Sequence, residues 1–429
     1  MRATALMAIL WLTCAAPVFA AGSAEDDALD LADATPESIK AVAGDWRVFT
    51  ELSAGQVSLR QGGAANTTAD TQRLSLDVLL DKQISPTLRG VFSDRLDKSR
   101  QSEAPGGSVQ TLNTFKEAYL SWQPQNDRVL GGGRINVRYG TAMGYNPTDY
   151  FREGANRSII SVDPNSIREN RMGTVMLRGQ TLWQGGSLTA LYAPKVADAP
   201  DDGDWSADFG STNNRNRWLL AVSHQLADNL NPQMVLYGDQ RQPVQLGLNL
   251  AALINDAMLA HLEWSGGRAK SLLAQALPWA PGVAQDEVFR NRLAAGLTYT
   301  SASKMSVALE YHYNGAAVDE AQWSALRSDS LLSYGSYRQV VQEQLELTTR
   351  HAAFVRATWQ DALVNKLDLA AMLRFNLDDS SHLAWLEARY RLNRAEVALQ
   401  WQLASGDALS DFGALAQRRN IQALFRYYF

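Results

Sequence analysis

The side chains best suited to acid–base or nucleophilic chemistry are few in this chain of 429 residues. Its five histidines are His224, His261, His312, His351 and His382. Two of them directly follow a serine, in the pairs Ser223-His224 and Ser381-His382. Adjacent side chains on a β-strand point to opposite faces, so a strand would keep each serine away from its histidine. Neither pair therefore fits a nucleophile with its base.

Two acid–histidine pairs have the i, i+2 spacing that places both side chains on one face of a strand. They are His261 with Glu263, and Glu310 with His312. Each pair could bind a metal ion or shuttle a proton, but either role needs further groups in a fixed geometry. A hydrogen bond inside a polar cavity explains both pairs with fewer requirements. We therefore predict no enzyme activity, no metal site and no cofactor.

Arginine is the charged residue that stands out. Lys and Arg together number 40, of which 8 are Lys and 32 are Arg. The planar guanidinium group makes bidentate contacts with carboxylates and other anions. The formal net charge of −5 gives no indication of a surface for nucleic acid. The arginines point instead to local charge contacts, which depend on the elements that carry them.

Those elements are predicted to be β-strands, because apolar and polar residues alternate over about ten positions in segments along the chain. In the last segment, one face carries the apolar set Ile421, Ala423, Phe425, Tyr427 and Phe429. The stretch 246–264 alternates in the same way on both sides of a turn at Asn255-Asp256. After the first 20 residues no apolar run reaches 18 residues, which excludes helical membrane spans.

The connections between these segments are alternately short and long. The long ones cover residues 98–110, 139–171, 196–214, 268–289 and 315–348. This pattern predicts an all-β fold, a single-chain transmembrane antiparallel β-barrel of about 18 strands with short periplasmic turns and long extracellular loops. A count of 16 is the alternative. A soluble β-sandwich would need several domains, and no Pro- or Gly-rich linker separates any.

The first 44 residues lack this alternation. Residues 1–20 read as a signal peptide cleaved after Ala20, which would remove Cys14, the only cysteine. Residues 21–44 form an acidic N-terminal periplasmic segment, in which Thr35-Pro36 favours the start of a short helix and a disordered tail is the alternative. Residues 45–429 then form the barrel.

Strand parity assigns the candidate lumen-lining residues, and arginines dominate them. They are Arg89, Arg95, Arg134, Arg138, Arg178, Arg217, Arg292, Arg356, Arg374, Arg389, Arg391 and Arg426. The inward acids are Asp77, Glu117, Glu310, Asp368, Glu387 and Glu396. Two interpretations stay open: a salt-bridged network that stiffens the wall, or a charged conduit that attracts anions.

Two long loops carry features of their own. Residues 139–171 hold the aromatic and polar set Tyr145, Asn146, Asp149, Tyr150 and Arg152. This loop either folds into the lumen as a constriction or covers the barrel as a lid. Residues 315–348 contain Asp319 as an N-cap ahead of Trp323 and Leu326, which predicts short helices that cap the mouth.

The alternating last strand with its aromatic positions Phe425, Tyr427 and Phe429 resembles the assembly signal of Gram-negative outer-membrane barrels. The architecture as a whole is similar to the porin and exopolysaccharide-export (alginate-export-like) kind. The resemblance implies a place in the cell outer membrane, among outer-membrane lipid and lipopolysaccharide. It also implies insertion by the barrel-assembly machinery, and the N-terminal segment could contact a periplasmic partner.

From this resemblance we expect a passive outer-membrane channel for polar or anionic small solutes or an acidic polysaccharide. The alternative is a plugged, non-conducting barrel that acts as a docking or structural protein of the envelope.

Overall fold

The computed structural model describes residues 45–60, 67–102, 108–227, 229–280, 282–283 and 285–429. The predicted signal peptide, residues 1–20, and the predicted N-terminal segment, residues 21–44, lie outside the described residues. All that follows concerns the barrel.

The described residues form 18 strands. Their bounds are β1 Trp46–Leu59, β2 Thr67–Ser85, β3 Leu88–Gln101, β4 Ser108–Gln125, β5 Arg128–Ile135, β6 Thr174–Trp183, β7 Gly186–Ala193, β8 Arg217–His224, β9 Gln233–Asp239, β10 Gln245–Asn255, β11 Met258–Lys270, β12 Glu287–Thr300, β13 Met305–Asn314, β14 His351–Trp359, β15 Leu367–Asn376, β16 His382–Arg391, β17 Ala395–Ser405 and β18 Gln417–Tyr428.

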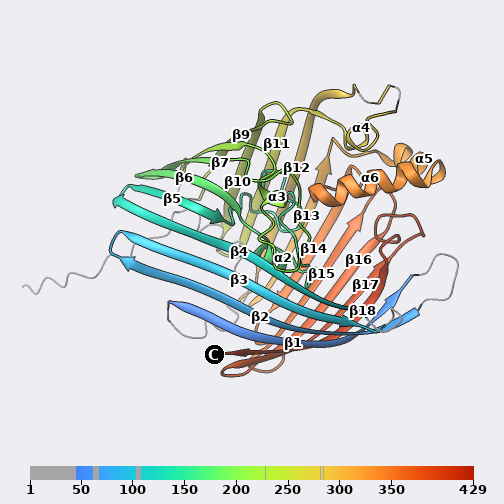
Figure 1. Cartoon of the computed structure of the whole chain (residues 1–429), viewed down its shortest axis with the longest axis horizontal. Coiled ribbons are helices and arrows are strands. Elements are labelled where there is room, and N and C mark those ends of the chain that lie inside the picture. Colours follow the sequence, from blue (N-terminus) through green and yellow to red (C-terminus); the bar gives the residue numbers. More distant parts are fainter. Residues whose placement is uncertain (1–44, 61–66, 103–107, 228, 281, 284) are drawn as a thin grey trace, which may run out of the picture. The chain divides into compact units, whose positions relative to one another are not determined.

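Every strand pairs antiparallel with its neighbours in sequence, and β1 pairs with both β2 and β18. The sheet is therefore closed, and it has no free edge. At the closure Glu51 faces Arg426 and Ala54 faces Ala423. Figure 1 shows β1 beside the last strand, β18, at the bottom of the barrel. The predicted all-β barrel of 18 strands is confirmed, and the alternative count of 16 is wrong.

The two faces of the wall differ as the alternation predicts. On the outside, Leu52, Leu74 and Phe425 are exposed, whereas Glu51 and Arg95 on the inside are buried. A wall that is apolar outside and polar inside suits a barrel with lipid around it and a polar lumen. Among the helices of the described residues, none is long and apolar enough to cross a membrane.

The short connections gather at one end of the barrel, called the turn end, and the long ones at the other, called the loop end. The longest loops, 136–173, 194–216 and 315–350, lie close to their predicted positions. Two other predicted loops are too long, because β3 continues to Gln101 and β12 already begins at Glu287. Polar residues at a strand end can continue the backbone ladder beyond the apolar band, so hydropathy alone ends these strands too early.

In the part of the chain that the structure describes, five helices lie within the connections. They are α2 Pro164–Asn170, α3 Phe209–Thr212, α4 Leu272–Ala276, α5 Glu320–Ser328 and α6 Leu331–Gln344. Asp319 caps α5 in a capping box with Gln322, as its position predicted. Helices α4, α5 and α6 pack through a buried cluster that includes Leu272, Trp323 and Tyr337. They lie together at the loop end (Figure 1).

Candidate functional site

The loop between β5 and β6, residues 136–173, is called here the inner loop because it is bonded to the inward face of the wall. It carries α2, whose N-cap Asp163 accepts a hydrogen bond from the backbone N–H of Ser166. Pro164 occupies the first helical position, where its missing N–H costs nothing. Of the two alternatives for residues 139–171, the structure has the loop that folds into the lumen.

Two buried wall carboxylates hold the inner loop. Glu310 on β13 accepts hydrogen bonds from the backbone N–H groups of Met143 and Gly144 at 2.7 and 2.9 Å. Glu263 on β11 accepts one from the backbone of Ala142 and another, at 3.2 Å, from the Thr148 hydroxyl. Hydrogen bonds to a charged acceptor are about twice as strong as neutral ones. The loop is therefore attached to the wall through its own backbone.

Glycines permit this close approach. Gly140 has φ +90°, and a Cβ there would lie 2.3 Å from a carboxylate oxygen of Glu263. A Cβ on Gly144 would lie 2.6 Å from the His312 ring and 2.7 Å from Phe354. Any larger residue at either position would push the loop off the wall.

A second anchor joins the inner loop to Glu346, which lies just after the end of α6. Glu346 receives hydrogen bonds from the Tyr145 hydroxyl at 2.6 Å and from Arg152 at 2.7 Å. Burial by itself would raise the pKa of Glu346, but Arg152 and Arg292 nearby lower that pKa below its ordinary value. The Arg152 guanidinium also lies over the Tyr145 ring, 4.9 Å from its centre. Glu346 is therefore ionised and ties two long loops together.

The other predicted residues of this loop are also bonded. Asp149 pairs with Arg171 at 2.6 Å, and Asn146 accepts from Arg168 at 2.9 Å. The Tyr150 ring stacks on Tyr237 of β9 at 4.5 Å. Burial raises the pKa of Tyr150 to about 12, so its hydroxyl stays protonated. The set predicted from sequence thus fixes the path of the loop.

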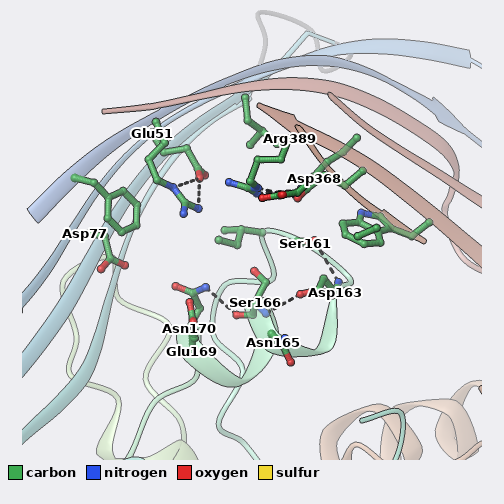
Figure 2. Close-up of a pocket in the computed structure, with 18 of the residues that line it drawn as sticks. Glu51, Asp77, Ser161, Asp163, Asn165, Ser166, Glu169, Asn170, Asp368 and Arg389 are labelled. Carbon is green, nitrogen blue, oxygen red and sulfur yellow. Dashed lines mark hydrogen bonds and ion pairs between the residues drawn. The ribbon is translucent and has the colours of Figure 1, made fainter. Parts of the chain in front are cut away.

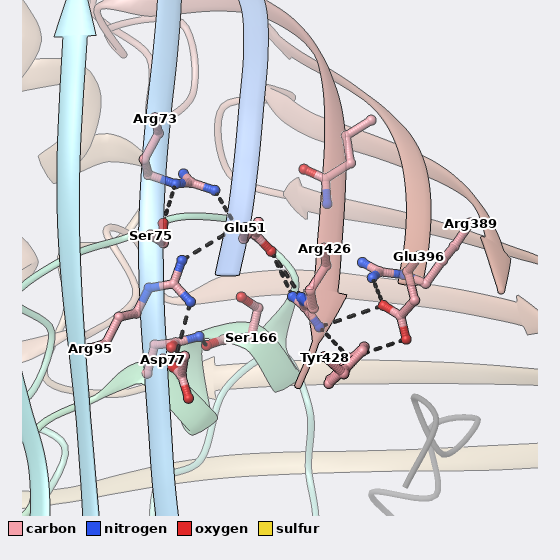
Figure 3. A network of polar contacts seen from close by, with 12 residues as sticks. Glu51, Arg73, Ser75, Asp77, Arg95, Ser166, Arg389, Glu396, Arg426 and Tyr428 are labelled. Atoms are coloured by element: carbon pink, nitrogen blue, oxygen red, sulfur yellow. Dashed lines mark hydrogen bonds and ion pairs between the residues drawn. The ribbon is translucent and has the colours of Figure 1, made fainter. Parts of the chain in front are cut away.

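A network of arginines and carboxylates covers the inner wall where the barrel closes (Figure 3). At its centre Glu51 on β1 contacts Arg426 at 2.8 Å, Arg73 at 2.7 Å and Arg95 at 3.3 Å. Arg426 and Arg389 both contact Glu396 on β17. Bidentate guanidinium groups suit such shared contacts. The network joins the first three strands to the last ones.

Most of the arginines predicted to line the lumen are paired with acids. Carboxylates lie within ion-pair distance of Arg89, Arg95, Arg292, Arg356, Arg389, Arg391 and Arg426. Arg134 instead donates to backbone carbonyls, including that of Gly173 at 3.0 Å, and Arg217 donates to that of Thr212. Arg178 donates to Gln180 at 2.9 Å. Arg374 lies 5.9 Å from the centre of the Phe354 ring.

One of these placements is corrected by the structure. Strand parity predicts a wall position for Arg138, but β5 ends at Ile135 and Arg138 belongs to the inner loop. The ladder between β5 and β6 ends there because the backbone N–H of Asn136 donates to the Glu117 carboxylate at 2.9 Å and that of Gly173 donates to the carbonyl of Lys116 at 2.8 Å. Alternating residues continue past this point, so the pattern alone cannot show where the strand ends.

A cavity lies between α2 and the arginine-rich wall, with about 1170 Å³ of empty space that includes open solvent. We call it the wall cavity. Figure 2 shows Asp163, Asn165 and Ser166 on the side of α2, facing Glu51 and Arg389 on the wall. Its lining holds six arginines and one lysine against six carboxylates. The formal charge of the lining is therefore +1.

A second cavity, the amide cavity, adjoins the first, with about 610 Å³ of empty space. The two cavities share the lining residues Ile160, Ser161, Trp385 and Gln400. The rest of the amide cavity's lining comes from the inner loop and from β17 and β18: Ile159, Val162, Gln402, Gln417, Asn420 and Gln422. Apart from Trp385, its wall side is therefore lined by neutral amides.

Several lining residues were missed by sequence reasoning. Arg47, whose side chain has no ion pair with another described residue, lies 5.8 Å from the centre of the Phe49 ring. Both amide atoms of Asn165 are buried and lack a hydrogen-bond partner in the described structure. Lys116 points inward because a β-bulge between β3 and β4 shifts the register there. Of these residues, only Asn165 could have been found from the sequence, because it belongs to the Asp163-Pro164-Asn165 motif that begins α2.

The two acid–histidine pairs of the sequence both meet the inner loop. His312 lies 2.8 Å from Glu310, and His261 lies 3.4 Å from the other oxygen of the same carboxylate. The Glu263 carboxylate instead accepts a hydrogen bond from the backbone of the inner loop at Ala142. In the described part of the chain, no three His, Cys, Asp or Glu residues are grouped to hold a metal ion.

Comparison with solved structures places the fold among porins. A BenF-like porin from Pseudomonas fluorescens Pf-5 matches with a TM-score of 0.54 and 10% identity, over 90% of this chain and 98% of that one. OpdQ from Pseudomonas aeruginosa matches with a TM-score of 0.52 and 10% identity, over 90% and 99%. OccAB1 from Acinetobacter baumannii matches with a TM-score of 0.50 and 11% identity, over 91% of this chain and 98% of that one.

A scan against protein-family models finds no match, and a search of curated proteins finds no relative. At about a tenth identity, likeness to solved structures shows the fold alone. None of these three structures supports the alginate-export part of the resemblance drawn from sequence. The barrel of this chain is a closed, 18-stranded antiparallel barrel with the fold of outer-membrane porins.

Proposed function

We propose that this chain is a passive channel of the Gram-negative outer membrane for small polar or anionic solutes. The observation that carries this proposal is that the wall cavity and the amide cavity share four lining residues. The wall cavity reaches Arg47 and Asp368, at the turn-end starts of β1 and β15. The amide cavity reaches Gln402 and Gln417, near the loop-end limits of β17 and β18. Together they form a path past the inner loop.

The inner loop favours small solutes over an acidic polymer. Because its backbone is bonded to Glu263 and Glu310 inside the lumen, a passing molecule must pass between the loop and the opposite wall. The path has hydrogen-bonding groups along its length, and such groups can replace part of a solute's hydration shell. A formal lining charge of +1 favours anions weakly.

The rival proposal is a plugged barrel that docks envelope partners. Recording from the purified full chain in planar lipid bilayers separates the two. Stable ohmic currents support the channel, and silence at all voltages supports the plugged barrel.

A bulky residue in the shared section gives a sharper test. Ser161 lines both cavities, so Ser161→Trp should lower the single-channel conductance. Ser324→Trp, at an exposed position on α5, is the matched control and should leave it unchanged. Equal currents in both variants would place the path elsewhere.

A further inference from the structure

The outer face of the barrel carries a groove that a channel for solutes does not need. It crosses β17, β18, β1, β2, β3 and β4, with about 1440 Å³ of empty space that includes open solvent. Its apolar lining includes Leu52, Leu74, Val109, Val397 and Phe425, all of them exposed. These side chains belong to the outward, lipid-facing set of the wall.

Small residues make the groove. Ala54 on β1 faces Ala423 on β18, and both are exposed on the outside. These two methyl groups lie side by side, between the larger pair Leu52–Phe425 and the larger pair Gln56–Ile421, and leave a depression in the wall. A linear hydrocarbon chain fits such a depression, since it can replace the missing side-chain volume by van der Waals contact.

Two cations lie beside this apolar surface. Lys98 and Arg100 line the groove from β3, and both are exposed. Their i, i+2 spacing places them on one face, about 7 Å apart along the strand. Neither side chain has an ion pair or hydrogen bond with another residue that the structure describes. No acidic residue lines the groove.

Unpaired cations on a lipid face are costly unless they lie near the membrane surface or meet an anion. Arg100 is one residue, and Lys98 three residues, from the loop-end limit of β3 at Gln101. In barrels of this kind the long loops are extracellular. The two cations therefore lie toward the outer leaflet, at the level of lipid headgroups.

We propose that this groove binds a phosphorylated, multiply acylated glycolipid of the outer leaflet, with a phosphate on Lys98 and Arg100 and an acyl chain along Ala54 and Ala423. The site rests on the membrane placement proposed above and is separate from the solute path. Charge complementarity favours an anionic lipid over a second copy of the chain, because the groove offers two cations with no ion pair to another described residue, and no acid lines it.

The test counts lipid bound to the purified, delipidated full chain by native mass spectrometry. The probe is a bisphosphorylated, hexa-acylated glucosamine disaccharide. A cation near a membrane surface contributes roughly a fivefold gain in binding, so the double variant K98Q/R100Q should bind about 30-fold more weakly. A54L, which fills the groove but keeps both charges, should also weaken binding.

Lys82 provides the matched control. It is exposed on the outward face of β2 and lies three residues from the turn-end limit of that strand at Ser85. K82Q should bind the probe as the wild type does. Equal losses in K82Q and K98Q/R100Q would show a general charge effect and overturn the site. Wild-type binding by K98Q/R100Q would overturn it as well.

Two further outcomes would also overturn the proposal. Inorganic phosphate that competes as well as the lipid would mean that the groove contributes nothing. A change of oligomeric state in A54L, with lipid binding intact, would make this face an interface between copies. Planar-bilayer currents of K98Q/R100Q should match the wild type, so failure of the lipid site and failure of the channel can be told apart.

Discussion

The attachment of the inner loop to Glu310 can be tested directly. The Glu310 carboxylate accepts two backbone hydrogen bonds from the loop, at 2.7 and 2.9 Å, and it is only 4% exposed. The variant Glu310→Ala removes both acceptors and leaves the N–H groups of Met143 and Gly144 facing an apolar methyl group. If the channel proposal holds, the loop should then leave the wall more often.

The expected size follows from the bonds removed. Hydrogen bonds to charged groups contribute about 1.5–3 kcal/mol each, so two of them contribute about 3–6 kcal/mol. A detached loop regains hydrogen bonds to water, which favours the lower limit. A loss of about 3 kcal/mol raises the detached population roughly 150-fold. Glu310→Gln keeps one acceptor oxygen and should give an intermediate effect.

Single-channel recording in planar bilayers measures this population as time spent at a second conductance level. Glu396→Gln is the matched control, because Glu396 is also buried but its carboxylate bonds, among the described residues, to Arg389, Arg426 and Tyr428 of the wall and not to the inner loop. The Glu396→Gln variant should show no second conductance level. A steady single-level current in Glu310→Ala, with wild-type noise, would refute the anchoring of the loop by this residue.

Four further changes have defined outcomes. Arg47→Glu changes the formal lining charge from +1 to −1, so reversal potentials in a salt gradient should shift toward cations, and an unchanged potential would remove Arg47 from the path. Glu51→Gln leaves three arginines without their shared carboxylate and should destabilise the barrel by about 3–5 kcal/mol in denaturant unfolding, and wild-type stability would contradict a structural role of this carboxylate. The pKa of Glu346 lies below its ordinary value of 4.5, so its contribution is complete above about pH 4.5 and is lost only as the pH falls through the lower folded value. Current noise should therefore stay constant from pH 7 to 5, and noise that rises in this range would contradict the anchor at Glu346. Phe429→Asp places a charge on the lipid face beside Tyr427 and should slow insertion into vesicles, whereas insertion at the wild-type rate would count against an assembly role.

The strands could be predicted from sequence because lipid outside and a polar lumen inside impose a period of two on every strand. The turn at Asn255-Asp256 and the cap at Asp319 were predictable for the same kind of reason, since both depend on neighbouring residues. These features need no knowledge of the rest of the fold.

The contacts across the barrel could not be predicted in this way. Glu51 meets Arg426 because β1 pairs with β18 in one register, and 375 positions separate the two residues. Lys116 points inward because a bulge shifts the face of β4, which alternation cannot reveal. The path of the inner loop depends on Glu263 and Glu310, each of which looked from sequence like part of a histidine pair.

The excess of arginine does not translate directly into positive charge in the lumen, because carboxylates pair with many of the arginines. Counted along the strands, arginines outnumber inward acids and predict a mild preference for anionic or polar solutes over cations. In the structure Glu51 alone contacts three of them, and Asp163 of the inner loop contacts Arg356 at 3.1 Å. In the proposed channel, the field that a solute meets is therefore set by the few charges that have no ion pair with another described residue, of which Arg47 is one. Under the proposed channel function, the network and the conduit share these residues, and neutralising a single shared carboxylate should change stability and selectivity together.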